Sequence, residues 1–129
     1  ANLQGISMIL QEANTIPGIT VAQNIFAGRE KEFTSHGIVR IKKMIRAAQA
    51  LLDKYEIGYI HAADQIDRYN FEDRKLIELV RCINENIEIL VVDETTTALS
   101  HNGRNVLYKL IHSPSKFLIY HHFLQIILL

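Results

Sequence analysis

Two adjacent acidic residues follow an uninterrupted apolar run, and this pair is the part of the chain best suited to chemistry. The run Ile89–Val92 is short and rich in β-branched residues, and Asp93 and Glu94 come directly after it. Such a run suits a strand of a parallel sheet, whose ligands bind beyond the carboxyl ends of the strands. One carboxylate there can hold Mg²⁺ through water, and the other can orient or deprotonate an attacking water. Taken alone, the pair favours the simpler interpretation, the acidic start of an ordinary loop.

Apolar segments alternate with amphipathic ones along the chain. Strands are predicted at Ile6–Leu10, Ile87–Val92 and Phe117–Tyr120. Helices are predicted at Val21–Ala27, Ile38–Tyr55, Glu72–Ile83 and from Ser100 to about His112. The segment Gln11–Thr20 is predicted to be a loop, with a turn at Pro17-Gly18. This alternation predicts an α/β fold with parallel strand pairing.

The longest predicted helix carries both an apolar stripe and a group of bases. Its apolar residues recur at helical spacing, from Ile38 and Ile41 through to Tyr55. In the helix Glu72–Ile83, the residues expected to face inward are Leu76, Leu79, Val80 and Ile83. The bases of the longer helix mostly fall off its apolar stripe and are expected to form a solvated face: Arg40, Lys42, Lys43 and Arg46.

Composition narrows the class of protein. A length of 129 residues suits one domain, and 14 basic against 14 acidic residues argue against nucleic-acid binding by bulk charge. The single cysteine, Cys82, favours a reducing setting and is expected to be a buried small hydrophobe. No signal peptide or membrane-spanning run is predicted. The histidines His112, His121 and His122 lack the ligand spacing of a zinc site.

The order of motifs resembles that of the nucleotide-binding domain of ABC transporters. Asp93-Glu94 precedes the stretch 95–100, a second apolar strand ends at Tyr120-His121-His122, and a strand near the start ends at Gln11. Asn24-Ile25-Phe26 and Gly28-Arg29-Glu30 look like the first cassette of bacterial ribose/galactose/xylose-type importers. The resemblance covers about residues 6 to 125.

A fold and a domain plan follow from this resemblance. It implies a partial P-loop NTPase-type (ABC cassette) α/β fold, with a parallel sheet and a helical subdomain. Residues 1–129 would form one partial nucleotide-binding domain that begins with the Q-loop strand. The helical subdomain would span about 21–83, and the region from Walker B to the switch histidine about 87–122.

Roles for individual residues also come from the resemblance. Gln11 matches the Q-loop glutamine, which in the family touches Mg²⁺ and water and links the site to the membrane subunit. Asp93 matches the Mg²⁺-holding Walker B aspartate, and Glu94 matches the catalytic glutamate that polarises water. Thr95 stands where a proline is usual. His122 matches the switch histidine that senses the γ-phosphate, although without the family context it is a solvated loop histidine.

The resemblance further implies a parent activity and its partners. The parent subunit would hydrolyse Mg-ATP and couple this hydrolysis to carbohydrate import. Its partners would be a membrane-spanning permease subunit and a second ATP-binding cassette. It would be cytoplasmic and peripheral at the inner face of the cell membrane.

Two departures from the family pattern argue that this chain alone is inactive. The signature position, found by alignment on the stretch 77–81, holds Tyr69, Asn70, Phe71, Glu72 and Asp73. Acids replace small residues there, and a like charge about 4 Å away costs on the order of 1 kcal/mol in water. We therefore expect no ATP sandwich with a competent cassette. The Walker A pattern is also missing, because no glycine is followed by lysine. We expect neither tight ATP binding nor hydrolysis.

Three interpretations remain open from the sequence. The first is a fragment of a sugar importer's ATP-binding subunit, with Walker A upstream of residue 1. The second is a degenerate, non-catalytic cassette that acts as an interaction module. The third is an unrelated α/β domain whose motifs match by coincidence.

The apolar end of the chain raises a question of pairing. The strand 117–120 would be an exposed edge if the Walker A strand were absent beside it. The tail 123–129 is also apolar. Either the tail folds back over this edge or two chains pair there, and self-association is the preferred expectation.

Overall fold

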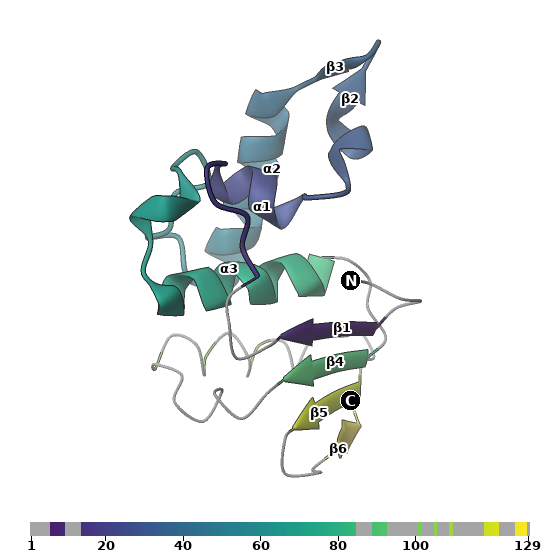
Figure 1. The fold of residues 1–129 in the computed structure, drawn as a ribbon, viewed down its shortest axis with the longest axis vertical. Helices are drawn as coiled ribbons and strands as arrows, with labels where there is room; N and C mark the ends of the chain where they lie inside the picture. Colours follow the sequence, from purple (N-terminus) through teal and green to yellow (C-terminus); the bar gives the residue numbers. More distant parts are fainter. Residues whose placement is uncertain are drawn as a thin grey trace.

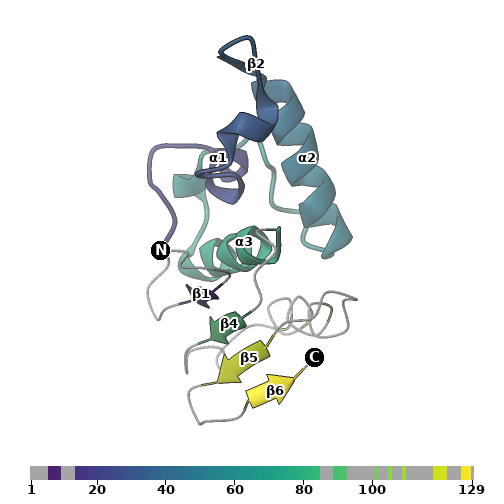
Figure 2. The same ribbon diagram turned by 90° about the vertical axis from the view of Figure 1, so that its right-hand side faces the viewer.

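A small sheet and a helical part are the two layers of the chain in this computed structural model (Figure 1). The structure describes residues 6–9, 14–84, 89–92, 101, 105, 109, 118–121 and 126–128. Figure 2 shows helix α3 (Phe71–Asn84) lying directly on the sheet, with the other helices above it.

The sheet contains three parallel strands and one antiparallel strand. These are β1 (Ile6–Ile9), β4 (Ile89–Val92), β5 (Leu118–His121) and β6 (Ile126–Leu128), in the order β1-β4-β5-β6. Strand β4 pairs in parallel with β1 on one side and with β5 on the other. The three predicted strands and their parallel pairing are therefore confirmed, each to within two residues.

Part of the apolar tail 123–129 forms strand β6. It pairs antiparallel with β5, and Ile119 lies opposite Ile127. The backbone groups on that edge of β5 are thus paired within the chain. Of the two expected outcomes, the structure shows the tail folded back. The edge of β5 on which the expectation of self-association rested is thus covered within the chain, and self-association itself stays a prediction.

The helical part is built from three helices and short connecting elements. The helices are α1 (Val21–Ile25), α2 (Ile41–Lys54) and α3. Two 3₁₀ helices, η1 (Glu30–Phe33) and η2 (Ile66–Arg68), and a two-stranded hairpin of β2 (Thr34–Ser35) and β3 (Ile38–Val39) complete it. Residues 101, 105 and 109, one helical turn apart, are helical within the predicted helix from Ser100.

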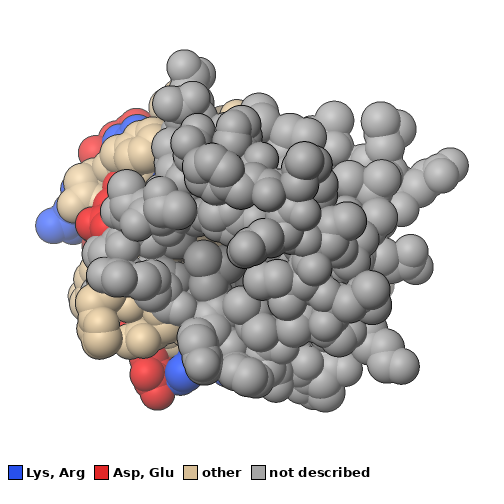
Figure 3. Space-filling model, turned by 90° about the horizontal axis from the view of Figure 1, so that it is seen from below, with Lys and Arg blue, Asp and Glu red and all other residues tan. Residues whose placement is uncertain are grey.

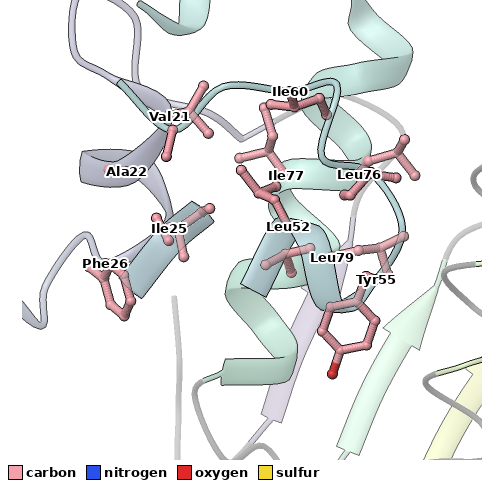
Figure 4. Close-up of a cluster of buried hydrophobic side chains, with 14 of the residues drawn as sticks. Val21, Ala22, Ile25, Phe26, Leu52, Tyr55, Ile60, Leu76, Ile77 and Leu79 are labelled. Atoms are coloured by element: carbon pink, nitrogen blue, oxygen red, sulfur yellow. The ribbon is translucent and has the colours of Figure 1, made fainter. Parts of the chain in front are cut away.

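The main hydrophobic core joins the three helices of this part (Figure 4). Ile25 from α1, Leu52 from α2 and Leu76 from α3 are each fully buried. Phe26 and Phe33 pack edge-on at the border of the cluster, with ring centroids 4.6 Å apart. Cys82 is buried with 4 % exposure, so its predicted role as a small hydrophobe is confirmed.

The prediction for the longest helix was wrong at its start. A helix was predicted from Ile38, but Ile38 and Val39 form a strand, and α2 begins at Ile41. The cause is the two-residue turn His36-Gly37, in which both residues have positive φ (53° and 78°). Such a turn matches the twist of a hairpin and favours an antiparallel strand directly after it. Ile38 and Ile41 were predicted to belong to the apolar stripe of this helix, and they are 69 % and 41 % exposed.

Helix α3 occupies the middle of the molecule. It contacts α1 on one side and β1 on the other. All six residues from Lys75 to Val80 are therefore buried, including two charged ones. The prediction that only one face of this helix is buried included too few residues, because the helix has neighbours on both sides. In the part of the chain that the structure describes, no helix is both long and apolar enough to cross a membrane.

Candidate functional site

The three parallel strands end level with one another at one edge of the sheet. Ile9 of β1 is in register with Val92 of β4, and Val92 is in register with His121 of β5. In sequence, the predicted site residues follow these strand ends directly or one residue later. They lie outside the described residues, and no geometry is given for them: Gln11, Asp93, Glu94 and His122.

The loop that follows Gln11 is described from Asn14 onward, and Asn24 of α1 holds its middle. The Asn24 Oδ1 accepts a hydrogen bond from the backbone N–H of Ile16 at 2.6 Å. Its Nδ2 donates to the carbonyl oxygens of Ile16 and Thr20 at 3.1 and 3.0 Å. Asn24 is only 2 % exposed, so one buried amide holds the loop at both Ile16 and Thr20.

The same loop is capped and paired at its far end. Thr20 and Gln23 form a reciprocal capping box at the start of α1. The carbonyl of Ile19 accepts from the N–H of Ile66 at 3.0 Å. Gly18, with a φ of 81°, donates its N–H to the carboxylate of Asp67 at 2.8 Å. The residues after the predicted Q-loop glutamine are thus tied to the helical part over their whole described length.

Glu78 connects the start of this loop to α3. Its carboxylate accepts from the backbone N–H and the Nδ2 of Asn14, both at 3.4 Å. Lys75 lies 3.9 Å away in an ion pair, and both side chains are about 6 % exposed. Burial raises the pKa of the Glu78 carboxyl above its ordinary value, against the smaller lowering effects of Lys75, Asn14 and Arg81. A titratable group therefore sits at the junction of the loop and the central helix.

The raised pKa makes a pH-dependent prediction for Glu78→Gln. Because the folded state keeps this proton where the unfolded chain has lost it, the group's contribution to stability falls as pH rises above its ordinary pKa. The variant has no such proton. Its free energy of unfolding, minus that of the wild type, is therefore expected to increase between about pH 4 and about pH 7 in urea titrations.

The control for that comparison is Glu30→Gln, which changes an exposed acid in η1. This variant shows how far the replacement of an exposed carboxyl alone changes the free energy of unfolding. A Glu78→Gln difference that stays constant or decreases with pH would show that the burial of Glu78 does not govern its titration.

The predicted signature segment forms the entry to α3. Asn70 precedes the helix, and its Oδ1 accepts the backbone N–H of Asp73 at 2.9 Å. Glu72 and Asp73 lie in the first turn. Asp73 Oδ1 also accepts the hydroxyl hydrogen of Tyr59 at 2.7 Å. This helix end is thus capped by its own residues and carries acids that complement its dipole.

Tyr69 anchors the segment to the connection before it. Its hydroxyl oxygen accepts the N–H of His61 at 2.8 Å, and its O–H donates to Asp64 Oδ2 at 2.8 Å. Burial raises the pKa of the Tyr69 hydroxyl. Phe71, by contrast, is 55 % exposed, with the Lys75 ammonium 5.4 Å from its ring centroid. The segment is rigidly held and presents a large aromatic ring and carboxylates.

Such an end is a poor receptor for an external anion. A helix N-terminus attracts phosphate through free N–H groups and a positive dipole end. Here one N–H is taken by Asn70, and two carboxylates already stand in the first turn. A bound phosphate would meet negative charge at this end of α3, which agrees with the expectation that the segment serves a partner's ATP poorly.

Sequence reasoning missed Asn24 and Glu78. Each is a polar residue within an apolar helical segment, and this is the signal that could have found them. A buried polar side chain needs partners, so a position of this kind indicates a link to a second segment. In both helices the second segment is the loop at residues 14–20.

Comparison with known sequences identifies close relatives. A ribose/galactose/methyl galactoside import ATP-binding protein of Halalkalibacterium halodurans is 36 % identical over 113 residues, which are 88 % of this chain and 22 % of that protein. A ribose import ATP-binding protein of Yersinia pestis is 36 % identical over 107 residues, 83 % of this chain and 20 % of that protein. A xylose import ATP-binding protein of Brucella abortus is 36 % identical over 112 residues, 87 % and 22 % respectively.

The chain thus spans about a fifth of the length of these relatives. No protein-family model matches it. The resemblance predicted from the motifs is confirmed, because the similar proteins are ribose, galactose and xylose import ATP-binding proteins.

Solved structures give the fold. A dimeric ATP-binding cassette in a post-hydrolysis state with ADP and Pi matches with a TM-score of 0.61 at 20 % identity, over 82 % of this chain and 45 % of that one. A metal-chelate type ABC transporter in an inward-facing conformation matches with a TM-score of 0.63 at 18 % identity, over 92 % and 48 %. The predicted fold class is confirmed.

Proposed function

We propose that this chain, similar in sequence to sugar-import ATP-binding proteins and with the fold of an ATP-binding cassette, supplies the water-activating part of an ATPase site. The observation that carries the proposal is the level ending of β1, β4 and β5, since the predicted residues follow these three ends in sequence. Carboxyl ends of neighbouring parallel strands are where α/β sheets bind ligands.

The proposed roles follow from the chemistry of each side chain. Asp93 and Gln11 would contribute oxygen ligands to Mg²⁺, which prefers such ligands and retains waters. Glu94 would orient and polarise the attacking water, and His122 would contact the γ-phosphate. These are the chain's own contributions to a site whose cofactor, Mg-ATP, supplies the phosphoryl group. The parent subunit would use them to drive carbohydrate import with a permease and a second cassette.

Phosphate binding is the part that these residues do not supply. Catalysis of phosphoryl transfer depends on a cradle of backbone N–H groups with a lysine, and no glycine-lysine pair occurs in the 129 residues. The signature segment, which would serve a partner's ATP, adds no phosphate-binding group either, because its helix end is capped internally and acidic. We therefore propose that the 129 residues alone neither bind Mg-ATP tightly nor hydrolyse it.

The competing function is a degenerate cassette that only binds a partner. The observation in its favour is the signature segment, where Phe71 and two acids replace small residues. The two functions differ in the coding DNA upstream of residue 1. An in-frame Gly-Lys-Ser/Thr motif there would support an ATPase subunit, whereas a natural start codon at this point would support the degenerate cassette.

Where that longer reading frame exists, its product tests the role of Glu94. Glu94→Gln keeps the size of the side chain but removes the base, so ATP hydrolysis is expected to fall by about a hundredfold or more while Mg-ATP binding persists. The matched control is Glu88→Gln, six residues earlier. Equal hydrolysis rates for the two variants would refute the role proposed for Glu94.

A further inference from the structure

An exposed apolar tip stands beside a run of bases at the end of the helical part. Among the described residues, six large hydrophobic side chains are exposed, and three of these fall within four successive positions: Ile38 at 69 %, Val39 at 37 % and Ile41 at 41 %. Figures 1 and 2 agree that the β2–β3 hairpin projects at the end of the molecule away from the sheet. Exposure of this kind in one place is typical of an interaction surface.

The apolar stripe of α2 explains why this tip is uncovered. Ile41 precedes the buried Met44 by three residues, so it continues the core-facing side of the helix. The core ends at Met44, and the stripe runs on past it through Ile41 into the hairpin. These side chains therefore face a position that no described segment of the chain fills.

The charged residues of the hairpin and of α2 are basic as far as Leu52, whereas η1 before them carries the exposed acids Glu30 and Glu32. From Phe33 to Leu52 there is no acidic residue, and the four bases are exposed: Arg40, Lys42, Lys43 and Arg46. By contrast, Figure 3 shows acidic and basic side chains side by side at the described rim of the face seen from below. The chain is neutral overall, so this run is a local concentration of positive charge.

The bases occupy the end of α2 where they are least favourable. The first turn of α2 holds no acid, and Arg40 at the N-cap makes no capping hydrogen bond with its side chain. Helices α1 and α3 begin with side-chain caps from Thr20 and Asn70. A positive helix end next to two lysines repels itself and is stabilised by external anions.

A hollow beneath the hairpin provides a place for such an anion. Its volume is about 200 Å³, and its lining is Glu32, Phe33, Thr34, Ser35, Arg40 and Lys43. The carboxylate of Glu32 accepts from Arg29 Nε at 2.7 Å, which offsets its charge. The two bases of the hollow, Arg40 and Lys43, are therefore the groups that can meet an anion, because the hydroxyls of Thr34 and Ser35 are hydrogen-bonded to the Glu30 carbonyl and to His36.

We propose that the hairpin tip and the start of α2 form a docking surface for a membrane of anionic phospholipids. Ile38 and Ile41 enter the interface between headgroups and acyl chains, while the bases and the hollow contact headgroup phosphates. Apolar side chains flanked by Lys and Arg are the combination that binds such surfaces. This proposal does not depend on the ATPase proposal, because it uses none of the same residues.

Co-sedimentation of the 129-residue chain with lipid vesicles tests the proposal. Binding is expected to vesicles of equal parts phosphatidylcholine and phosphatidylglycerol, and to weaken with salt, but not to phosphatidylcholine alone. The double variant Ile38→Ser/Ile41→Ser is expected to lower the partition coefficient by about tenfold. Lys42→Gln/Lys43→Gln is expected to lower it by about fivefold for each charge removed.

Matched controls separate the docking surface from general effects. Ile16 is 44 % exposed, close to the value of Ile41, and Lys54 lies at the other end of α2. Ile16→Ser and Lys54→Gln are expected to leave vesicle binding unchanged. All variants are expected to remain folded, with the unfolding midpoint of Lys42→Gln/Lys43→Gln at or above that of the wild type. The proposal is overturned if the chain binds no vesicles or binds both compositions equally. It is also overturned if the isoleucine variant binds as well as the wild type.

Discussion

Leu52→Ala is expected to lower the free energy of unfolding by about 3 kcal/mol. Leu52 is fully buried in the hydrophobic cluster to which α1, α2 and α3 all contribute (Figure 4). Truncation loses the transfer free energy of the side chain and leaves a cavity that the surrounding helices fill only in part. Urea unfolding followed by circular dichroism measures the change.

The adjacent Leu51→Ala is the matched control for this substitution. Leu51 packs against the same cluster but is only partly buried, and it lines an open hollow of about 360 Å³. Leu51→Ala is expected to lower the free energy of unfolding by about 1 kcal/mol, since water can fill the space that the side chain leaves. An equal loss for both variants would mean that the three helices do not share the core described here.

Asn24→Ala is expected to cost about 2 to 3 kcal/mol and to release the loop at residues 14–20. The substitution removes all three hydrogen bonds that the buried amide makes to Ile16 and Thr20. Backbone groups left without partners favour a loop conformation open to water. Limited proteolysis should then cleave within this loop faster than in the wild type, and urea unfolding gives the change in stability.

Asn24→Asp distinguishes the contribution of the accepting side-chain oxygen from that of the donating NH₂ group. It keeps the oxygen that accepts from Ile16 but places a carboxyl group against two carbonyl oxygens. Burial next to these oxygens favours the protonated form, so this variant should be more stable relative to Asn24→Ala at acidic pH than at neutral pH. Unchanged proteolysis in Asn24→Ala would contradict the role of Asn24 in holding the loop.

Local patterns were sufficient to predict the parallel strands and most of each helix. The run Ile89–Val92 is apolar at every position, and this marks a strand covered on both faces. The resemblance to a cassette also implied that these strands belong to one parallel sheet. These features depend on short-range sequence, so they need no knowledge of the rest of the fold.

The errors arose where distant segments decide the outcome. Ile38 and Ile41 have helical spacing, but the turn at His36-Gly37 and the end of the core determine their places. Glu78 is buried because α3 has neighbours on both sides, which the periodicity of a single helix does not reveal. Strand β6 depends on the free edge of β5, and the sequence allowed two ways to cover that edge.

The candidate site was predicted in part. The ends of β1, β4 and β5 lie level, as the motif order required, while the side chains beyond them lie outside the described residues. The segment Tyr69–Asp73 is described, and it forms an internally capped, acidic helix start. Its hydrogen bonds to Tyr59, His61 and Asp64 were not predictable, because they join segments that the sequence pattern does not connect.

Calorimetric titration of the 129-residue chain with Mg-ATP is the most direct test of the central claim. This claim is that the residues at the strand ends do not bind the nucleotide tightly without a Walker A motif. An ATP-binding cassette that contains the Walker A motif serves as the positive control in the same buffer. The account predicts no saturable heat for the chain at micromolar nucleotide concentrations, because the groups that neutralise the phosphates are missing. Saturable binding with a low-micromolar Kd would contradict it.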